Sequence, residues 1–214
     1  MEILKNRIQI EVYSELEIRK YIQCNDFKSA IEICKEKDFN SRTCFNIAML
    51  SMKLEKYEDA ILYFEAAIKL DSWLSIAYCM YGILMQKQNR LIKAIELYDD
   101  AILTFRNHKT IEYHQLGMDC TLEVVNIFVN RIICLYNCGL LESAELDLSR
   151  AQNIDPSISS LIVQLQKDPA HSKEFFMFYS KQIKGKPSKT SYYMGPLSVV
   201  IYGSNITSMF KSYK

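Results

Sequence analysis

The sequence predicts an all-α fold, and three observations lead to that prediction. Residues 46–71 align with residues 80–105 at a constant offset of 34. In both stretches apolar residues recur at steps of three and four, which is the spacing of one helix face. The chain holds only six Gly and four Pro, which leaves little room for loops. The residues that recur at the offset are Ala48 with Gly82, Ala60 with Ala94, Phe64 with Tyr98, and Ala67 with Ala101.

An offset of 34 residues is the period of the tetratricopeptide repeat (TPR), in which two antiparallel helices form a unit that stacks on the next. Small residues at recurring positions let helix backbones approach, and large ones fill the space between units. Weaker repeats flank the two clear ones. The first predicts helices over 11–24 and 27–35, and the last predicts helices over 118–136 and 141–153. The sequence therefore predicts a TPR solenoid of four repeats.

A segment of sixteen extra residues separates the third repeat from the fourth. The slot of Ala94 is next filled by Ala144, which lies 50 residues on instead of 34. Within the insertion, 105–121, Ile111 and Tyr113 alternate with polar residues, so we expect an extended segment with these two side chains inward. Leu116 and Gly117 are expected to lead back into a helix. Because so long a connection is uncommon in a compact domain unless it is functional or disordered, the insertion is expected to bind a partner.

The predicted organisation has three parts. Residues 1–156 form the TPR domain with its insertion at 105–121, since Asp155 and Pro156 end the repeat pattern. Residues 157–180 are expected to form capping helices. Residues 181–214 combine a lysine-rich linker over 181–189 with an apolar segment over 192–202. Solvation of the linker is the simpler interpretation, and contact with an acidic membrane is the alternative.

Composition argues against several classes of function. A net charge of +1 provides no steering toward nucleic acid. Three His without nucleophile–base spacing, and no glycine-rich phosphate loop, predict that the chain is no enzyme and holds no cofactor. Seven scattered Cys predict reduced thiols in a cytoplasmic protein, and Cys134 and Cys138 lack partners for a metal site. The charged N-terminus is unlike a signal peptide, and no apolar run approaches a membrane span of about 20 residues.

TPR domains have two other functions that bear on this sequence. A co-chaperone clamp needs Lys, Asn and Arg side chains at set positions to hold a peptide carboxylate, and only Asn46 fits. A generic scaffold that binds a peptide, or its own tail, in the concave groove of the repeats stays open as the alternative. The clamp positions are occupied by Glu15, Arg19, Asn46, Ile76 and Met80.

Specific motifs carry a resemblance beyond the repeat itself. They are Ser41-Arg42, Cys44-Phe45-Asn46-Ile47, Ala101-Ile102-Leu103 leading to Arg106, Ile111-Glu112-Tyr113 and Leu116-Gly117. Over 26–154 the chain resembles the N-terminal TPR domain of the large cytosolic activator subunit of phagocyte-type NADPH oxidases. That domain has four repeats and an insertion at the same place. In that family the insertion and neighbouring inter-repeat loops bind a Rac-type small GTPase in its GTP state.

The resemblance implies a set of GTPase-binding residues. Arg106 matches the key cation of the insertion, and a guanidinium is suited to backbone carbonyls or a carboxylate. Trp73 stands where the family usually has His, and His108, Thr110 and Glu112 replace Asn, Leu and Asp. The expected set is Ser41, Asp71, Trp73, Arg106, Asn107, His108, Thr110 and Glu112.

The tail resembles the short activation segment that follows the TPR domain in the same family. Val199 would stand at a position that the family needs to switch on electron transfer, whereas Pro196 and Leu197 depart from the pattern. Packing of the tail into the TPR groove is the alternative. The resemblance implies a non-catalytic effector of a Rac-type GTPase that is cytoplasmic, is recruited to the membrane, and meets a membrane subunit of the oxidase. The matching residues are Tyr193, Met194, Gly195, Val199 and Val200.

Overall fold

The computed structural model describes residues 2–113, 121–156 and 158, and side chains from residue 13 onward. Nearly all of these residues are helical, and two short strands pair with each other near the end of the third helical hairpin. The elements are α1 (Glu2–Gln23), α2 (Phe27–Lys35), α3 (Ser41–Lys53), α4 (Tyr57–Leu70), α5 (Ser75–Lys87), α6 (Leu91–Thr104), β1 (Thr110–Glu112), β2 (Thr121–Glu123), α7 (Val124–Asn137) and α8 (Leu141–Ile154).

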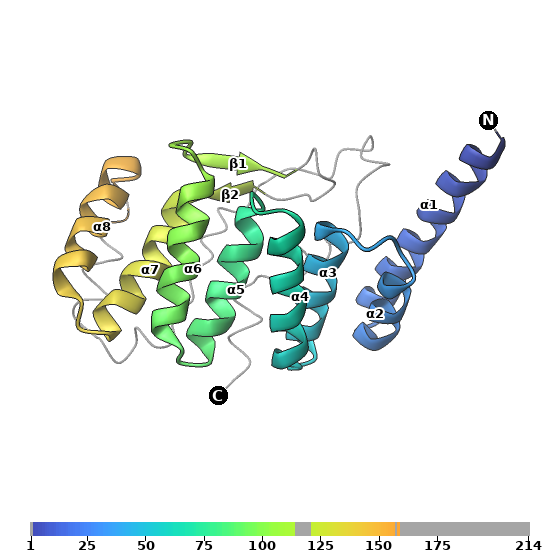
Figure 1. The fold of residues 1–214 in the computed structure, drawn as a ribbon, viewed down its shortest axis with the longest axis horizontal. Helices are drawn as coiled ribbons and strands as arrows, with labels where there is room; N and C mark the ends of the chain where they lie inside the picture. The colour runs from blue at the N-terminus through green and yellow to red at the C-terminus, as the bar shows by residue number, and fades with distance from the viewer. Residues whose placement is uncertain (1, 114–120, 157, 159–214) are drawn as a thin grey trace. The chain divides into compact units, whose positions relative to one another are not determined.

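The chain forms two compact units. Among the described residues, the first unit comprises 2–71, 112–113 and 121, and contains α1 to α4. The second comprises 72–111, 122–156 and 158, and contains α5 to α8. Within each unit, consecutive helices pack as hairpins: α3 against α4 in the first, and α5 against α6 and α7 against α8 in the second (Figure 1).

Each helical hairpin reverses direction through the same backbone device. A residue with positive φ stands two positions after the first helix of the pair ends. The N–H of the following residue then bonds the carbonyl five residues earlier, at 2.8 to 2.9 Å in all four turns. This is the Schellman motif, which satisfies carbonyls that a helix end leaves open. The four residues with positive φ are Asn25, Glu55, Asn89 and Gly139.

The small and large positions of the repeat pack as predicted. In the second unit, the fully buried Tyr98 ring lies against Gly82, and its hydroxyl donates to Gln86 Oε1 at 2.9 Å. In the first unit, Phe45 and Phe64 stand with ring centroids 6.0 Å apart. The alanines of the repeat have no exposed surface, which confirms that they serve close helix packing: Ala48, Ala60, Ala67, Ala94 and Ala101.

An ion-pair network joins three helices of the second unit. Arg131 on α7 places Nε 2.8 Å from Asp99 Oδ1 on α6 and also pairs with Asp147 on α8. Asp147 is buried, and burial raises the pKa of its carboxyl above the usual range while Arg131 opposes that rise. The network ties α6, from which the insertion departs, to the helices that follow it.

Two predicted helix starts were wrong. The first helix begins at Glu2, nine residues earlier than expected. The last repeat begins at Val124 instead of 118, because Thr121–Glu123 pairs with β1 and the N–H of Val124 donates to the carbonyl of Lys109 at 3.0 Å. Among the described residues no helix is long and apolar enough to cross a bilayer. The expected turn at Leu116 and Gly117 and the helices over 157–180 lie outside the described residues, apart from the buried Ile158.

Candidate protein-binding surface

The insertion begins with a tight turn that presents Arg106 and Asn107. The N–H of His108 donates to the carbonyl of Phe105 at 2.8 Å, which closes a four-residue β-turn. Its two central residues, Arg106 and Asn107, have φ of 47° and 67°. Two successive positive φ values are typical of a type I′ turn, where Gly and Asn are favoured and Arg is costly. Strain of this kind in an exposed turn is a feature of binding sites.

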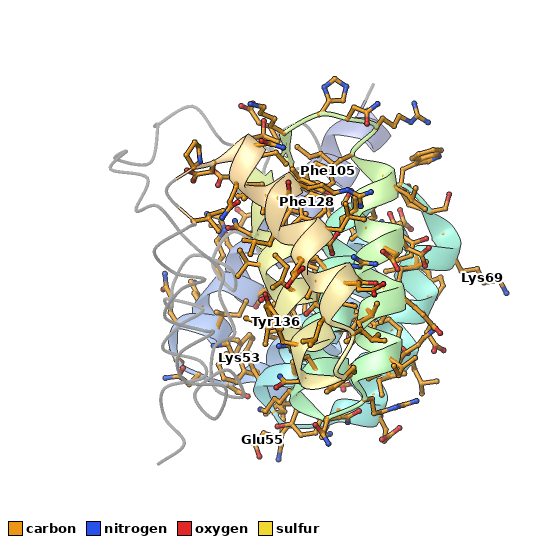
Figure 2. All side chains as sticks on the ribbon, turned by 90° about the vertical axis from the view of Figure 1, so that its left-hand side faces the viewer. Lys53, Glu55, Lys69, Phe105, Phe128 and Tyr136 are labelled. Atoms are coloured by element: carbon orange, nitrogen blue, oxygen red, sulfur yellow. The ribbon has the colours of Figure 1, made fainter. Side chains whose placement is uncertain are left out.

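Buried aromatic residues stand at both ends of the segment 105–113, which contains this turn and β1. Phe105 is 1% exposed, and Figure 2 places it with Phe128 of α7 at the same end of the second unit. Tyr113, at the far end of β1, is 2% exposed. Ile111 is half-buried between the exposed Thr110 and Glu112. The predicted alternation is thus confirmed, and the polar side chains of the segment face solvent.

The exposed Arg106 does not project freely. Its guanidinium carbon lies 3.8 Å from the centroid of the Trp73 ring, which precedes α5. A stacked cation–π pair of this type contributes about 0.5–1 kcal/mol at an exposed site. The structure therefore brings together two residues that stand 33 positions apart in the sequence, and both belong to the predicted site.

A hydrogen bond beneath the stack explains why Trp73 and Arg106 meet. The hydroxyls of Ser75, at the start of α5, and Thr104, at the end of α6, are hydrogen-bonded to each other. Thr104 also donates to the carbonyl of Ala101 at 2.6 Å, and the N–H of Ser75 donates to the carbonyl of Trp73 at 2.9 Å. Trp73 and Arg106 each stand two residues from this bonded pair, so the hairpin geometry sets their spacing.

The remaining predicted residues fall into two groups. Asn107, His108 and Thr110 are exposed on the same segment as Arg106. Ser41 and Asp71 lie in the first unit at helix ends: Ser41 begins α3, and the N–H of Asp71 caps α4 by donating to the carbonyl of Ala67 at 3.0 Å.

The described residues include neither the predicted activation segment nor a metal centre. The candidate activation residues, including Val199, lie outside the described residues. In the part of the chain that the structure describes, no group of three or more His, Cys, Asp or Glu side chains is arranged to hold a metal ion. A cavity of about 250 Å³ opens between α2, α3 and α4, where Lys28, Lys35 and Tyr63 are among its lining residues, and it includes none of the predicted site.

Sequence reasoning missed two features. Leu103, in the last turn of α6, is 72% exposed, although in the sequence it stands out only as part of a family motif and not as a surface residue. In addition, the amides of Asn46 and Asn130 are buried and have side-chain atoms without hydrogen-bond partners among the described residues. These two residues occupy the same slot of the repeat, which also holds Met80, so a comparison of slots would have found them.

Comparisons with known proteins first define the class. Residues 41–72 match the tetratricopeptide repeat family. Among solved structures, MamA protein has a TM-score of 0.53 at 16% identity, with 69% of this chain and 74% of that chain covered. YrrB, described as a TPR protein with an unusual peptide-binding site, has a TM-score of 0.52 at 17% identity, with 69% of each chain covered. These identities show the fold alone, and they confirm the predicted all-α TPR class.

More specific similarity is to proteins named NADPH oxidase activator and neutrophil cytosol factor 2. NADPH oxidase activator of Dictyostelium discoideum is 28% identical over 122 residues, which is 57% of this chain and 20% of that protein. Neutrophil cytosol factor 2 is 28% identical in Mus musculus and 26% in Homo sapiens, over 149 residues, or 69% of this chain and 26% of each relative. The predicted resemblance is confirmed, at low identity, over the TPR region. The chain matches about a quarter or less of the length of these relatives.

Proposed function

We propose that this chain is a non-catalytic effector that binds a Rac-type small GTPase in its GTP state and thereby contributes to the activation of a membrane NADPH oxidase. The observation that carries the proposal is Arg106, held at the tip of a strained turn and stacked on Trp73. A planar guanidinium in this position offers donors to backbone carbonyls or to a carboxylate on a switch loop. Similarity to proteins named NADPH oxidase activator supports the oxidase part of this proposal.

Dependence on GTP comes from the partner. Switch loops of small GTPases are ordered by the γ-phosphate and released after hydrolysis. A surface that recognises an ordered loop therefore distinguishes the two nucleotide states without contacting the nucleotide. The polar character of the segment, with Asn107, His108, Thr110 and Glu112 exposed, fits a modest and transient affinity.

A binding measurement tests the GTPase assignment. Dissociation constants are measured for the whole chain with a Rac-type GTPase loaded with a non-hydrolysable GTP analogue or with GDP. Arg106→Glu is expected to weaken binding of the GTP form by at least about tenfold, since it replaces N–H donors by a negative charge that the acceptor groups of the switch loop repel. The matched control is Lys93→Glu, an equal charge change on the exposed first turn of α6. Equal affinity for Arg106→Glu and wild type, or no binding by wild type, would reject the assignment.

Oxidase activation is tested separately. Superoxide production by membranes that contain the oxidase is measured after addition of the GTPase and the whole chain. Val199→Ala is expected to lower the rate at unchanged GTPase affinity, whereas Arg106→Glu lowers it through lost binding. An unchanged rate with Val199→Ala would remove the activation segment from the proposal.

A TPR scaffold that binds a peptide or its own tail remains the second candidate. The observation that favours it is the shared repeat slot of Asn46 and Asn130, whose buried amides have unpaired atoms among the described residues. Each of these amides offers both donors and an acceptor, which are the groups that a peptide backbone pairs with. If the insertion is the GTPase site, the affinity for the GTP-loaded GTPase stays within about threefold of wild type in Asn46→Ala and in Asn130→Ala. A loss comparable to that of Arg106→Glu would instead assign GTPase binding to this slot.

A further inference from the structure

Arg106 connects two exposed apolar residues of the second unit, because its guanidinium stacks on Trp73 and its backbone N–H bonds to Leu103. We call Trp73, Leu103 and Arg106 together the Trp73 cluster. Trp73 is 56% exposed and Leu103 is 72% exposed. The N–H of Arg106, which lies two residues past the end of α6, donates to the carbonyl of Leu103 in the last turn of that helix at 3.3 Å. Single exposed apolar residues are ordinary on protein surfaces, but these two flank an arginine held in a strained backbone.

We propose that Trp73 is the residue that positions Arg106 and sets the specificity of this surface. The proposal rests on the function proposed above and deepens it. The Trp73 cluster takes a switch loop of the GTP-loaded GTPase that offers an apolar side chain directly beside a backbone carbonyl or a carboxylate. The apolar group packs on Leu103 and the uncovered part of the indole ring, while the acceptor receives N–H groups of Arg106.

The geometry of stacking explains how Trp73 acts through Arg106. A guanidinium carries five N–H donors, and all of them lie in its plane. An aromatic ring beneath that plane covers one face and leaves every donor available at the edge. The stack thus restricts a long, flexible side chain before binding, and less conformational entropy is lost when the partner arrives. A side chain that does not stack at position 73 leaves Arg106 in place but without a preferred orientation.

The apolar component decides which acceptors are recognised. A solvated carboxylate that binds Arg106 alone contributes little binding free energy, because exposed ion pairs are weak. An acceptor that arrives with an apolar neighbour covers Leu103 and Trp73 and excludes water from the same hydrogen bonds. The Trp73 cluster therefore favours a folded loop over a free acidic peptide.

Trp73 is the chain's single tryptophan, which provides a direct test of the stack without any partner. Acrylamide quenching of the intrinsic fluorescence reports the exposure of this one ring. Arg106→Ala uncovers one face and is expected to raise the quenching constant about twofold. The matched control, Lys109→Ala, removes a cation three residues away and is expected to leave quenching unchanged. Equal quenching in wild type and Arg106→Ala would overturn the stack.

A double-mutant cycle tests positioning in the presence of the GTPase. Dissociation constants are compared for wild type, Trp73→Ala, Arg106→Ala and the double variant. We expect Trp73→Ala to weaken binding about tenfold, and the double variant to be weaker than Arg106→Ala by much less than that factor. Trp73→Phe keeps an aromatic face and is expected to remain within about threefold of wild type. Independent effects whose fold-changes multiply, or full affinity of Trp73→Ala, would refute positioning.

Leu103→Ser tests the apolar component by itself. It is expected to weaken GTPase binding about fivefold with unchanged tryptophan quenching, because it removes apolar contact area and leaves the stack intact. Unchanged affinity would remove Leu103 from the surface. If wild type binds no GTP-loaded GTPase, the proposed function fails together with this choice of partner, while the quenching experiment still decides whether Trp73 holds Arg106.

Discussion

At the scale of single residues, the close packing of Gly82 against the Tyr98 ring shows how one repeat differs from the next. A Cβ placed on Gly82 would lie 2.6 Å from Tyr98 Cε1. In the preceding repeat the same two slots hold Ala48 and Phe64, which are both buried. The difference lies in the hydroxyl of Tyr98, which is tied to Gln86 at 2.9 Å. A ring tethered at its far end cannot move away, so the facing position requires glycine.

Gly82→Ala is therefore expected to destabilise the protein. Overpacking costs about 1–3 kcal/mol and alanine in a helix gains roughly 1 kcal/mol, so the free energy of unfolding falls by up to about 2 kcal/mol. A second substitution, Tyr98→Phe, frees the ring from Gln86. We expect the double variant to lose less stability than the sum of the losses of the two single variants. Chemical denaturation of wild type, both single variants and the double variant measures these free energies. Strict additivity would mean that the tether does not matter.

At the scale of elements, the connection from α6 to β1 decides how the insertion is presented. Phe105 is the C-cap of α6, the turn reverses the chain at Arg106 and Asn107, and β1 then pairs with β2. Because each step uses backbone hydrogen bonds or a buried ring, the segment is held mainly by groups other than its exposed side chains, except at the turn, where positive φ favours Asn107. This explains how the polar residues can differ from the family pattern while the projection is retained.

Substitution of Asn107 tests this role of the turn. A β-branched residue with positive φ is strained by roughly 1–2 kcal/mol, so Asn107→Ile is expected to lower the free energy of unfolding by about that amount and to weaken GTPase binding by misplacing Arg106. Asn107→Gly provides the matched control, since glycine adopts positive φ without strain. Denaturation and binding measurements on both variants distinguish the effects. Wild-type affinity of Asn107→Ile would show that the turn conformation does not contribute to the surface.

At the scale of the whole molecule, buried thiols report how each compact unit opens. Burial raises the pKa of Cys34 in the first unit to about 11, and that of Cys79 and Cys134 in the second unit to about 12. These thiols are protonated at neutral pH and out of contact with solvent. Alkylation of such groups requires local or global opening, because the thiolate is the reactive form.

We expect Cys34 to be alkylated before Cys79 and Cys134 under native conditions. Cys34 lies in the first repeat, and the terminal unit of a repeat array has a neighbour on one side only and opens more easily. Timed labelling with mass spectrometry measures the order, in a Cys24→Ser, Cys120→Ser background that removes the exposed thiol of Cys24 and the thiol of Cys120, which lies outside the described residues. Labelling of Cys79 or Cys134 ahead of Cys34 would contradict this view of the array.

Much of the fold was predictable because the same pattern of small and large residues occurs in two successive repeats. The 34-residue offset identifies the helices, the small and large positions, and the length of the insertion, since a stacked hairpin repeats the same contacts each time. The starts of α1 and α7 were not predictable from this pattern. Sequence periodicity does not show where a backbone leaves a helix in order to pair with another strand, as Thr121–Glu123 does with β1.

The sequence by itself determined the class of fold, the place of the insertion, and its inward and outward faces. Those properties follow from local periodicity and residue chemistry, whereas the role of Arg106 as the key cation is what the family resemblance implies. Only the tertiary structure revealed that Trp73 stacks on Arg106, that Leu103 is exposed, and that the turn between helix and strand is strained. The reason is physical. The contact between positions 73 and 106 exists because the Ser75–Thr104 bond joins the start of one helix to the end of the next, a relation that no local pattern contains.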